Sequence, residues 1–178
     1  GMLTLNSLDS KGYLTRTNFD INRTIKDTAA TFEGTCSAKG ITFDLTFADS
    51  IQMVYADLGK IQQVLYNLID NAIKYGAAEQ PITVECAQQG KQAVLRVSNF
   101  GPGMTAEEIE HIFEPFYRTD KERSREMGSA GLGLSICMKI VREHGGTLSA
   151  QSVPGGETTF TAIFPLLRKE GADDEAEA

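Results

Sequence analysis

Three polar residues recur at helical spacing in a segment with a continuous apolar face. Asn67, Asn71 and Lys74 lie at i, i+4 and i+7, so a helix would place them on one face, about 5–6 Å apart. An amide oxygen is a hard ligand that suits Mg²⁺, which keeps most of its waters and bridges phosphates. A lysine supplies a point charge for phosphate oxygens. This face can hold a phosphate with its metal ion, or it can be an ordinary solvated face, and the helix alone does not decide between the two.

Two glycine-rich segments downstream would let the backbone approach a bound molecule. Gly101 and Gly103 follow a predicted strand that ends at Asn99, and glycines there allow a sharp turn or contact with a flat ligand. The segment 128–134 opens a predicted helix, whose free N–H groups and positive dipole end are typical of an anion site. It matches neither the P-loop nor the dinucleotide fingerprint. Four cations precede the helix: Arg118, Lys121, Arg123 and Arg125. Each feature alone also fits a plain loop or a solvated charge run.

Composition narrows the class of protein. The chain has 178 residues, 41% hydrophobic and 23% charged, which is ordinary for one globular domain. A net charge of −7 argues against a nucleic-acid-binding module, which usually shows a basic footprint. No apolar run reaches the ~20 residues that span a bilayer, so we expect no membrane helix. The three cysteines, Cys36, Cys86 and Cys137, form no Cys-x-x-Cys pair, which excludes a zinc knuckle and fits a reducing compartment.

The elements that position these residues follow from hydrophobic periodicity. Weak alternation predicts an edge strand over 14–19, and Asp20 is placed to N-cap the next helix. Strict alternation over 41–47 predicts a strand, and 52–55 predicts another short one. The clearest helix covers 57–75, where seven apolar residues form a core stripe at helical spacing. These residues are Ile61, Val64, Leu65, Leu68, Ile69, Ala72 and Ile73.

The second half of the chain contains two predicted hairpins and two predicted helices. The hairpins cover 81–87 with 92–99 and 147–151 with 158–164, and the helices cover 105–111 and 132–144. Thr105 with Glu108 three residues later forms a capping box at the start of the first helix. Gly145 and Gly146 end the second helix. The charged segment 118–130 lacks apolar periodicity, so we expect a mobile loop there.

This order of elements predicts one domain with a single sheet. Because hairpins and helices are mixed, we expect helices on one face of the sheet, a two-layer α/β sandwich over residues 13–167. Residues 1–12 combine an expression-tag remnant at Gly1 with a short leucine-containing piece that fits the end of a helix. The segment 168–178 holds five acids and little apolar content, so we expect a disordered tail.

Four short motifs follow one another along the chain. They are NLIDNAIKY (67–75), NFGPGM (99–104), IFEPFYR (112–118) and GLGLSI (131–136). Together they resemble the N, G1, F and G2 boxes of bacterial sensor histidine kinases, and HGG at 144–146 resembles that family's glycine pair after its last long helix. The resemblance covers residues 13–166, and residues 2–10 resemble the end of the family's second dimerisation helix, which belongs to its phosphoacceptor domain. It implies a Bergerat-type ATP-binding fold, shared with gyrase and mismatch-repair ATPases, with a mixed five-stranded sheet and three main helices on one face.

The resemblance implies a role for each matching residue. Asn71 would bind Mg²⁺ through its amide oxygen. Asn67 and Lys74 would contact the phosphates of ATP, and Tyr75 would lie near the nucleoside. Asn99 would meet the adenine amino group.

The loop and lid residues have implied roles as well. Gly101 and Gly103 would let the backbone pass the base, and Met104 would pack against it. Three residues would anchor the lid: Phe113, Pro115 and Phe116. Both phenylalanines are also expected to be core anchors. The N–H groups of four residues would hold the triphosphate: Gly131, Leu132, Gly133 and Leu134. Arg118 would reach the phosphates, so the catalytic roles would fall to Asn67, Lys74 and Arg118.

The residue at position 67 separates kinases from ATPases within this resemblance. The ATPases place a Glu four residues before the metal-binding Asn, as the base that activates water, and the amide of Asn67 cannot take a proton at working pH. The resemblance therefore implies a protein-histidine kinase that transfers the ATP γ-phosphate to a histidine on a separate dimerisation domain, for relay to a response regulator. It implies a cytoplasmic domain, monomeric as a fragment, from a homodimer anchored in the bacterial plasma membrane.

Two departures from the family pattern keep alternatives open. The family usually has Asp at the position of Asn99, and its G2 box usually reads GGTGLGL where this chain has GSAG at 128–131. These departures motivate a non-catalytic nucleotide-binding or scaffold module as an alternative. An anti-sigma-factor serine kinase of the same fold is another, which a Glu in place of Asn67 would have favoured. Neither His111 nor His144 has the context of a phosphoacceptor, and we expect His144 to act as a cationic or donating ring at the end of its helix.

Overall fold

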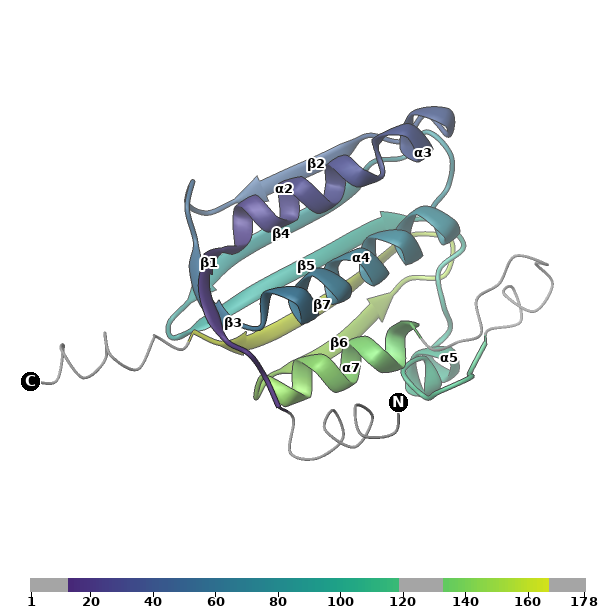
Figure 1. Cartoon of the computed structure of the whole chain (residues 1–178). Coiled ribbons are helices and arrows are strands. Elements are labelled where there is room, and N and C mark those ends of the chain that lie inside the picture. The colour runs from purple at the N-terminus through teal and green to yellow at the C-terminus, as the bar shows by residue number, and fades with distance from the viewer. Residues whose placement is uncertain (1–12, 119–132, 167–178) are drawn as a thin grey trace, which may run out of the picture.

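A five-stranded mixed sheet forms the base of the fold in the computed structural model, which describes residues 13–118 and 133–166 (Figure 1). Its spatial order is β2 (Phe43–Phe47), β4 (Ile82–Gln89), β5 (Gln92–Phe100), β7 (Glu157–Pro165) and β6 (Thr147–Ser152). The β2–β4 pair is parallel and the other three pairs are antiparallel. The predicted mixed sheet is therefore confirmed. The predictions for 1–12, 119–130 and 168–178 fall outside the described residues.

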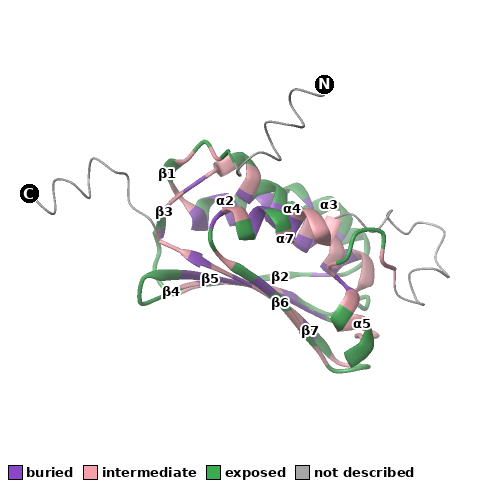
Figure 2. Ribbon diagram, turned by 90° about the horizontal axis from the view of Figure 1, so that it is seen from below, coloured by how far each residue is buried: buried purple, intermediate pink, exposed green. Residues whose placement is uncertain are grey.

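Three helices form a second layer over the sheet. They are α2 (Ile21–Thr31), α4 (Leu58–Tyr75) and α7 (Gly133–Glu143). Figure 2 shows this layer on one face of the strands, with buried residues concentrated between the two layers. The predicted two-layer α/β sandwich with three main helices on one face is confirmed.

Helix α4 lies in the middle of the helical layer and carries four of the predicted site residues (Figure 1). Its N-cap is Asp57, whose carboxylate accepts a hydrogen bond from the N–H of Lys60 at 3.2 Å. All seven residues of the predicted apolar stripe are buried. Burying one aliphatic side chain stabilises a fold by about 1.5–3 kcal/mol, so the stripe fixes the rotation of the helix about its axis. The polar residues beside the stripe are thereby held at its partly exposed edge.

Both predicted hairpins and the short helix between them are present. A tight turn at Gly90, with a φ of +61°, joins β4 to β5, and β6 pairs antiparallel with β7. Helix α5 (Ala106–His111) begins with the predicted capping box. Thr105 Oγ1 accepts from the N–H of Glu108 at 3.1 Å, and Glu108 Oε1 accepts from the N–H of Thr105 at 3.0 Å. Gly145, just after α7, has a φ of +80° and ends that helix.

The prediction of a single sheet is wrong in one respect, because the N-terminal strand lies outside the main sheet. It forms β1 (Thr17–Asp20), which pairs with β3 (Met53–Ala56) in a separate two-stranded antiparallel sheet. The reason is local. The Asp20 carboxylate accepts hydrogen bonds from the N–H groups of Asn22 at 3.1 Å and Gln52 at 3.0 Å, which holds both strands at the start of α2.

Helix α3 (Glu33–Ala38) was not predicted from the sequence. Its six residues, EGTCSA, have no apolar periodicity and bury only Cys36. The next residue, Lys39, donates from its ammonium to the carbonyl of Ile73 at 3.0 Å. This contact satisfies a carbonyl in the last turn of α4, where a cation is favourable.

Candidate functional site

The C-terminal half of α4 carries the three polar residues predicted to share one face. Asn67, Asn71 and Lys74 are each partly exposed, because they lie beside the buried stripe. The ammonium of Lys74 pairs with the carboxylate of Asp70 at 3.0 Å, and the two side chains are 34% and 33% exposed. An ion pair this exposed contributes little to stability. The ammonium can therefore exchange Asp70 for an anionic ligand at small cost.

The start of α7 lies against Asn67. The side-chain amide of Asn67 donates to the carbonyl of Gly133 at 3.4 Å, and a Cβ at Gly133 would lie 3.9 Å from Asn67 Cγ. Gly133 and Leu134 form the first turn of α7, and Leu134 also packs against the core. The helix N-terminus predicted as an anion site thus meets the predicted phosphate-binding face. Gly131 and Leu132 lie outside the described residues.

The end of β5 packs onto the end of α4. A Cβ at Gly101 would lie 2.4 Å from the carbonyl oxygen of Tyr75, so only glycine allows this approach. The N–H of Ala77 donates to the carbonyl of Phe100 at 2.7 Å and joins the same two segments. Asn99 is 7% exposed and lies two residues after the core residue Val97 in β5, which places both side chains on the face that the helices cover. Tyr75 and Asn99 are thereby brought to one end of the sheet.

The loop after β5 is bound to the connection between β6 and β7. Gly103 has a φ of +73°, and a Cβ there would lie 2.5 Å from the carbonyl oxygen of Val153. The N–H of Met104 donates to Ser152 Oγ at 2.9 Å. Because the loop is tied at both residues, its position depends on the end of β6.

Ser152 and Thr158 lie beside the predicted site residues Met104 and Asn99, and the sequence did not predict this. Ser152 Oγ lies 2.6 Å from Thr158 Oγ1, so the two hydroxyls are hydrogen-bonded. Thr158 is buried and stands opposite Asn99 in the register of β5 with β7. Their only signal in the sequence is a place in the last predicted hairpin, and that hairpin's pairing with β5 is a long-range property.

The two phenylalanines of the F box have different environments. Phe113 packs against the core, with its ring nearly perpendicular to that of Phe160 and 6.0 Å between centroids. Phe116 is 70% exposed, so the expectation that it is also a core anchor is wrong. The backbone turns at Phe116 with a left-handed φ of +68°, and the side chain is left on the solvent side of the turn. Pro115 is exposed and Arg118 is partly exposed.

The two histidines occupy contrasting environments. His111 is exposed, and a 2.6 Å hydrogen bond between its Nδ1 and Glu114 raises its pKa. His144 is buried at the end of α7, and burial lowers its pKa. Its Nδ1–H donates to the carbonyl of Ile140 at 2.9 Å. The expected donating ring at the helix C-terminus is confirmed, in the neutral rather than the cationic form.

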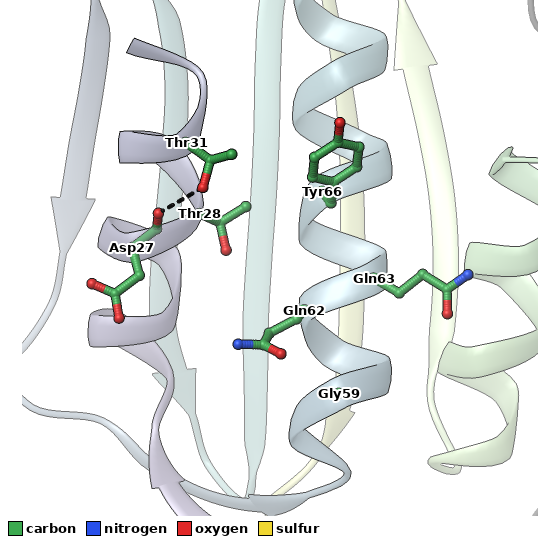
Figure 3. Close-up of a pocket in the computed structure, with 7 residues that line it drawn as sticks. All are labelled: Asp27, Thr28, Thr31, Gly59, Gln62, Gln63 and Tyr66. Carbon is green, nitrogen blue, oxygen red and sulfur yellow. Dashed lines mark hydrogen bonds between the residues drawn. The ribbon is translucent and has the colours of Figure 1, made fainter.

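A surface groove of about 370 Å³ lies between α2 and α4 (Figure 3). It is lined by Asp27, Thr28, Thr31, Gly59, Gln62, Gln63 and Tyr66. These side chains offer amides, hydroxyls and one carboxylate, and none of them is a cation that could bind a phosphate. None of the predicted site residues lines the groove, and we assign it no ligand.

Within residues 13–118 and 133–166, none of the helices has the length and hydropathy that a membrane span requires. In the same part of the chain, no three side chains of His, Cys, Asp or Glu come together as a metal site.

Comparison with known proteins places this geometry in a family. Residues 56–168 match the family described as histidine kinase-, DNA gyrase B- and HSP90-like ATPases. Over 99% of its length the chain is 34% identical to the sensor histidine kinase WalK of Bacillus subtilis, of which it spans 29%. The nucleotide-free catalytic domain of the histidine kinase ThkA has a TM-score of 0.77 at 32% identity, covering 86% of this chain and 97% of that one. ThkA in complex with the response regulator protein TrrA gives 0.76 at 29% identity, covering 93% of this chain and 46% of that one.

The matched segment includes α4, α7 and the strands β4 to β7, and therefore every predicted site residue. The likeness to the ThkA catalytic domain extends over nearly all of that domain. The chain belongs to the histidine kinase-, DNA gyrase B- and HSP90-like ATPases, as the catalytic ATP-binding domain of a sensor histidine kinase.

Proposed function

We propose that this domain binds Mg·ATP where the end of α4, the start of α7 and the end of β5 meet, and that it donates the γ-phosphate to a histidine of a separate domain. The observation that carries this proposal is the meeting of three motifs that are far apart in the sequence. Asn67 hydrogen-bonds to Gly133, and Gly101 packs directly on Tyr75. The N, G2 and G1 motifs thereby share one end of the domain.

Mg²⁺ fits the donor set at the end of α4. Asn71 offers an amide oxygen, and phosphate and water oxygens would complete the shell of the ion. When bound, the ion neutralises charge on the phosphates. Lys74 would add a positive charge beside it on leaving Asp70, and the N–H groups of Gly133 and Leu134 would donate to phosphate oxygens.

The base would lie at the end of β5. Asn99, buried on the face that the helices cover, offers both a donor and an acceptor to a base edge. Gly101 and Gly103 keep side chains out of the loop where it passes the base, and the partly buried Met104 would pack against the ring. Thr158, opposite Asn99, adds a hydroxyl at the same end.

Asn67 favours transfer over hydrolysis. Its amide cannot accept a proton from water at working pH, and its nitrogen is already bonded to the carbonyl of Gly133. The site therefore has no base at the position where the hydrolytic members place one. In the proposed transfer, an imidazole nitrogen forms a bond to the γ-phosphorus while the bond to the bridging oxygen breaks and ADP leaves. Lys74 and Arg118 would act by positioning and by neutralising charge.

The intact protein is part of this proposal, because the chain spans 29% of WalK. ThkA is a histidine kinase that has been solved with the response regulator protein TrrA. By analogy we propose that the intact protein carries a dimerisation domain with the phosphoacceptor histidine, works as a homodimer and passes the phosphoryl group to a response regulator. We place this domain in the cytoplasm and a membrane anchor elsewhere in the protein.

Calorimetric titration with ATP, with and without Mg²⁺, tests the metal assignment. We expect Asn71→Ala to lose the Mg²⁺-dependent part of ATP binding and to keep its melting temperature, because Asn71 lies outside the buried stripe. Gln63→Ala removes an exposed amide of the same helix and should bind like the parent. Unchanged Mg·ATP affinity in Asn71→Ala would contradict the assignment, and a large fall in melting temperature would indicate a structural role instead.

Phosphotransfer is tested with γ-labelled ATP. The domain alone should stay unlabelled, since neither histidine fits a phosphoacceptor. Acid-labile label should appear on the dimerisation domain when the two are mixed. ATP binding without any transfer would favour the non-catalytic alternative, and acid-labile label on this domain alone would contradict the proposal.

A further inference from the structure

His144 is held in a single protonation state by two hydrogen bonds. The ring is 3% exposed, and its Nε2 lies 3.1 Å from the backbone nitrogen of Asp57, whose N–H donates to it. Its Nδ1 lies 2.9 Å from the carbonyl oxygen of Ile140, which can only accept. Nδ1 therefore carries the proton and Nε2 carries the lone pair, so the buried ring is neutral.

The partner of His144 joins three segments of the chain. Asp57 is the N-cap of α4, and its Oδ1 accepts from the N–H of Lys60 at 3.2 Å. Its Oδ2 accepts from the N–H of Thr15 at 3.0 Å, in the segment that leads into β1. His144 thus connects the end of α7 to the start of α4 and, through Asp57, to the segment before β1.

In the described part of the chain, polar contacts cross between α4 and α7, with their capping residues, along the whole overlap of the two helices. From one end to the other they are Asp57–His144 at 3.1 Å, Lys60–Glu143 at 3.4 Å, Val64–Cys137 at 3.8 Å and Asn67–Gly133 at 3.4 Å. The two helices are therefore antiparallel, and the contact at His144 lies at the opposite end from the nucleotide site. Helix α7 has 11 residues, so the two ends are about 16 Å apart.

We propose that His144 is a positioning residue for the nucleotide site: its neutral ring sets the register of α7 against α4, and protonation of Nε2 releases that register and weakens nucleotide binding. Because α7 is a rigid helix, a shift at His144 moves Gly133 relative to Asn67. Among these contacts, the one at His144 is made by an imidazole, the side chain whose ordinary pKa lies closest to neutral pH. The inference rests on the proposed nucleotide site.

The charges around the ring give the direction of the pH dependence. Burial is the main cause of the lowered pKa of His144, and the nearby Arg16 acts in the same direction. The Ile140 carbonyl, Asp57 and Glu143 oppose it, and Lys60 faces Glu143 from α4. The folded ring therefore binds fewer protons than the unfolded one. Its contribution to stability is fully present above the ordinary pKa of 6.5 and is lost as the pH falls toward the lowered value.

The experiment uses the fact that the chain has two histidines. In a His111→Gln background, His144 supplies the only imidazole signals in an NMR titration of the ring protons from pH 8 to pH 5. By linkage, if protonation of His144 weakens ATP binding, then bound ATP must lower the His144 pKa by the same factor. We expect that downward shift. An unchanged titration with ATP bound would overturn the inference.

Affinity measurements complete the test. Protonation of His144 costs one hydrogen bond. ATP affinity of the His111→Gln protein should therefore fall about threefold to tenfold as the pH is lowered from 7.5 through the lowered pKa of His144, beyond the fall in a His111→Gln/His144→Gln control. The control is needed because phosphate itself ionises near pH 6. Gln can accept from the N–H of Asp57 and does not titrate. Equal pH profiles would overturn this inference alone, and failure of ATP to bind at any pH would overturn the proposed nucleotide site with it.

Discussion

Asn99 is the residue on which base selectivity depends in the proposed site. Adenine presents an amino donor where guanine presents a carbonyl acceptor, and an amide can turn to suit either. A carboxylate only accepts, and charge-assisted hydrogen bonds are about twice as strong as neutral ones. We expect Asn99→Asp to raise the ratio of ATP affinity to GTP affinity about fivefold, which corresponds to a binding free-energy difference of about 1 kcal/mol.

The control for this change is Asn18→Asp, an exposed position in β1 that should leave the ratio unaltered. Titration of both variants with both nucleotides decides the matter. A ratio that stays the same or falls in Asn99→Asp would mean that this side chain does not read the base edge.

Ser152 should matter for the base rather than for the phosphates. Its hydroxyl holds the N–H of Met104 and meets Thr158, so Ser152→Ala frees the loop after β5. We expect ATP affinity to fall about threefold to tenfold, the range of one hydrogen bond, while affinity for inorganic triphosphate stays unchanged. Ser149→Ala, an exposed serine of the same strand, is the matched control. If Ser152→Ala lost affinity equally for ATP and for inorganic triphosphate, the effect would not arise from contacts with the base.

Some residues of the candidate site could be predicted from the sequence, and others became apparent only in the structure. Asn67, Asn71 and Lys74 could be predicted because helical spacing is local and puts them on one face. Ser152 and Thr158 could not, because they reach Met104 and Asn99 through strand pairing between distant segments. The solvent exposure of Phe116 could not be predicted either, because a left-handed φ at a phenylalanine has no sequence signature.

At the scale of elements, the contact between β5 and α4 depends on a missing side chain. A Cβ at Gly101 would lie 2.4 Å from a backbone oxygen of α4, which cannot move without the helix. We expect Gly101→Ala to destabilise the domain by about 1–3 kcal/mol, the usual cost of overpacking, and to weaken ATP binding. Denaturant unfolding measures the first effect and calorimetry the second.

Gly34 in α3 gives the opposite expectation and serves as the control. A Cβ there meets nothing within 4 Å, and its backbone is helical. Gly34→Ala should stabilise the domain by up to about 1 kcal/mol. A destabilised Gly34→Ala, or a Gly101→Ala as stable as the parent, would contradict this account of the two glycines.

The elements themselves were predictable where a pattern is long. Helix α4 follows from seven apolar positions at one spacing, and the β4–β5 hairpin follows from alternation on both sides of a glycine turn. Helix α3 has six residues and one buried side chain, so no periodicity develops. The β1–β3 pair depends on the carboxylate of Asp20, which also caps α2. The sequence predicts the cap, but it does not show that the same carboxylate also binds the N–H of Gln52.

At the scale of the whole molecule, the three cysteines report on the integrity of the core. All three are free and buried, and burial raises the pKa of Cys86 and of Cys137 to about 12. Burial also raises the pKa of Cys36. We expect the native domain to resist alkylation at pH 8 and to expose three thiols together on unfolding, because the thiolate is the reactive form. Rapid labelling of native protein would contradict the packing described here.

The sheet order shows the limit of prediction at this scale. Mixed hairpins and helices predicted a two-layer sandwich, but the parallel pairing of β2 with β4 joins strands separated by β3 and α4. Nothing in the alternation of Phe43, Leu45 and Phe47 specifies a parallel neighbour. That choice comes from the connection through α4, which must cross the sheet to bury its stripe.

The amide at position 67 has a consequence in time. In nucleotide switches that hydrolyse their ligand, the lifetime of the nucleoside-triphosphate-bound state is set by the protein's own hydrolysis rate. In the proposed site, Asn67 is hydrogen-bonded to Gly133 and has no group that could accept a proton from water and so start hydrolysis. A loaded domain would then wait, and its lifetime would be set by how fast ATP dissociates and how often an imidazole arrives. The signal from such a domain would depend on the number of encounters with the phosphoacceptor and not on the time since ATP was bound.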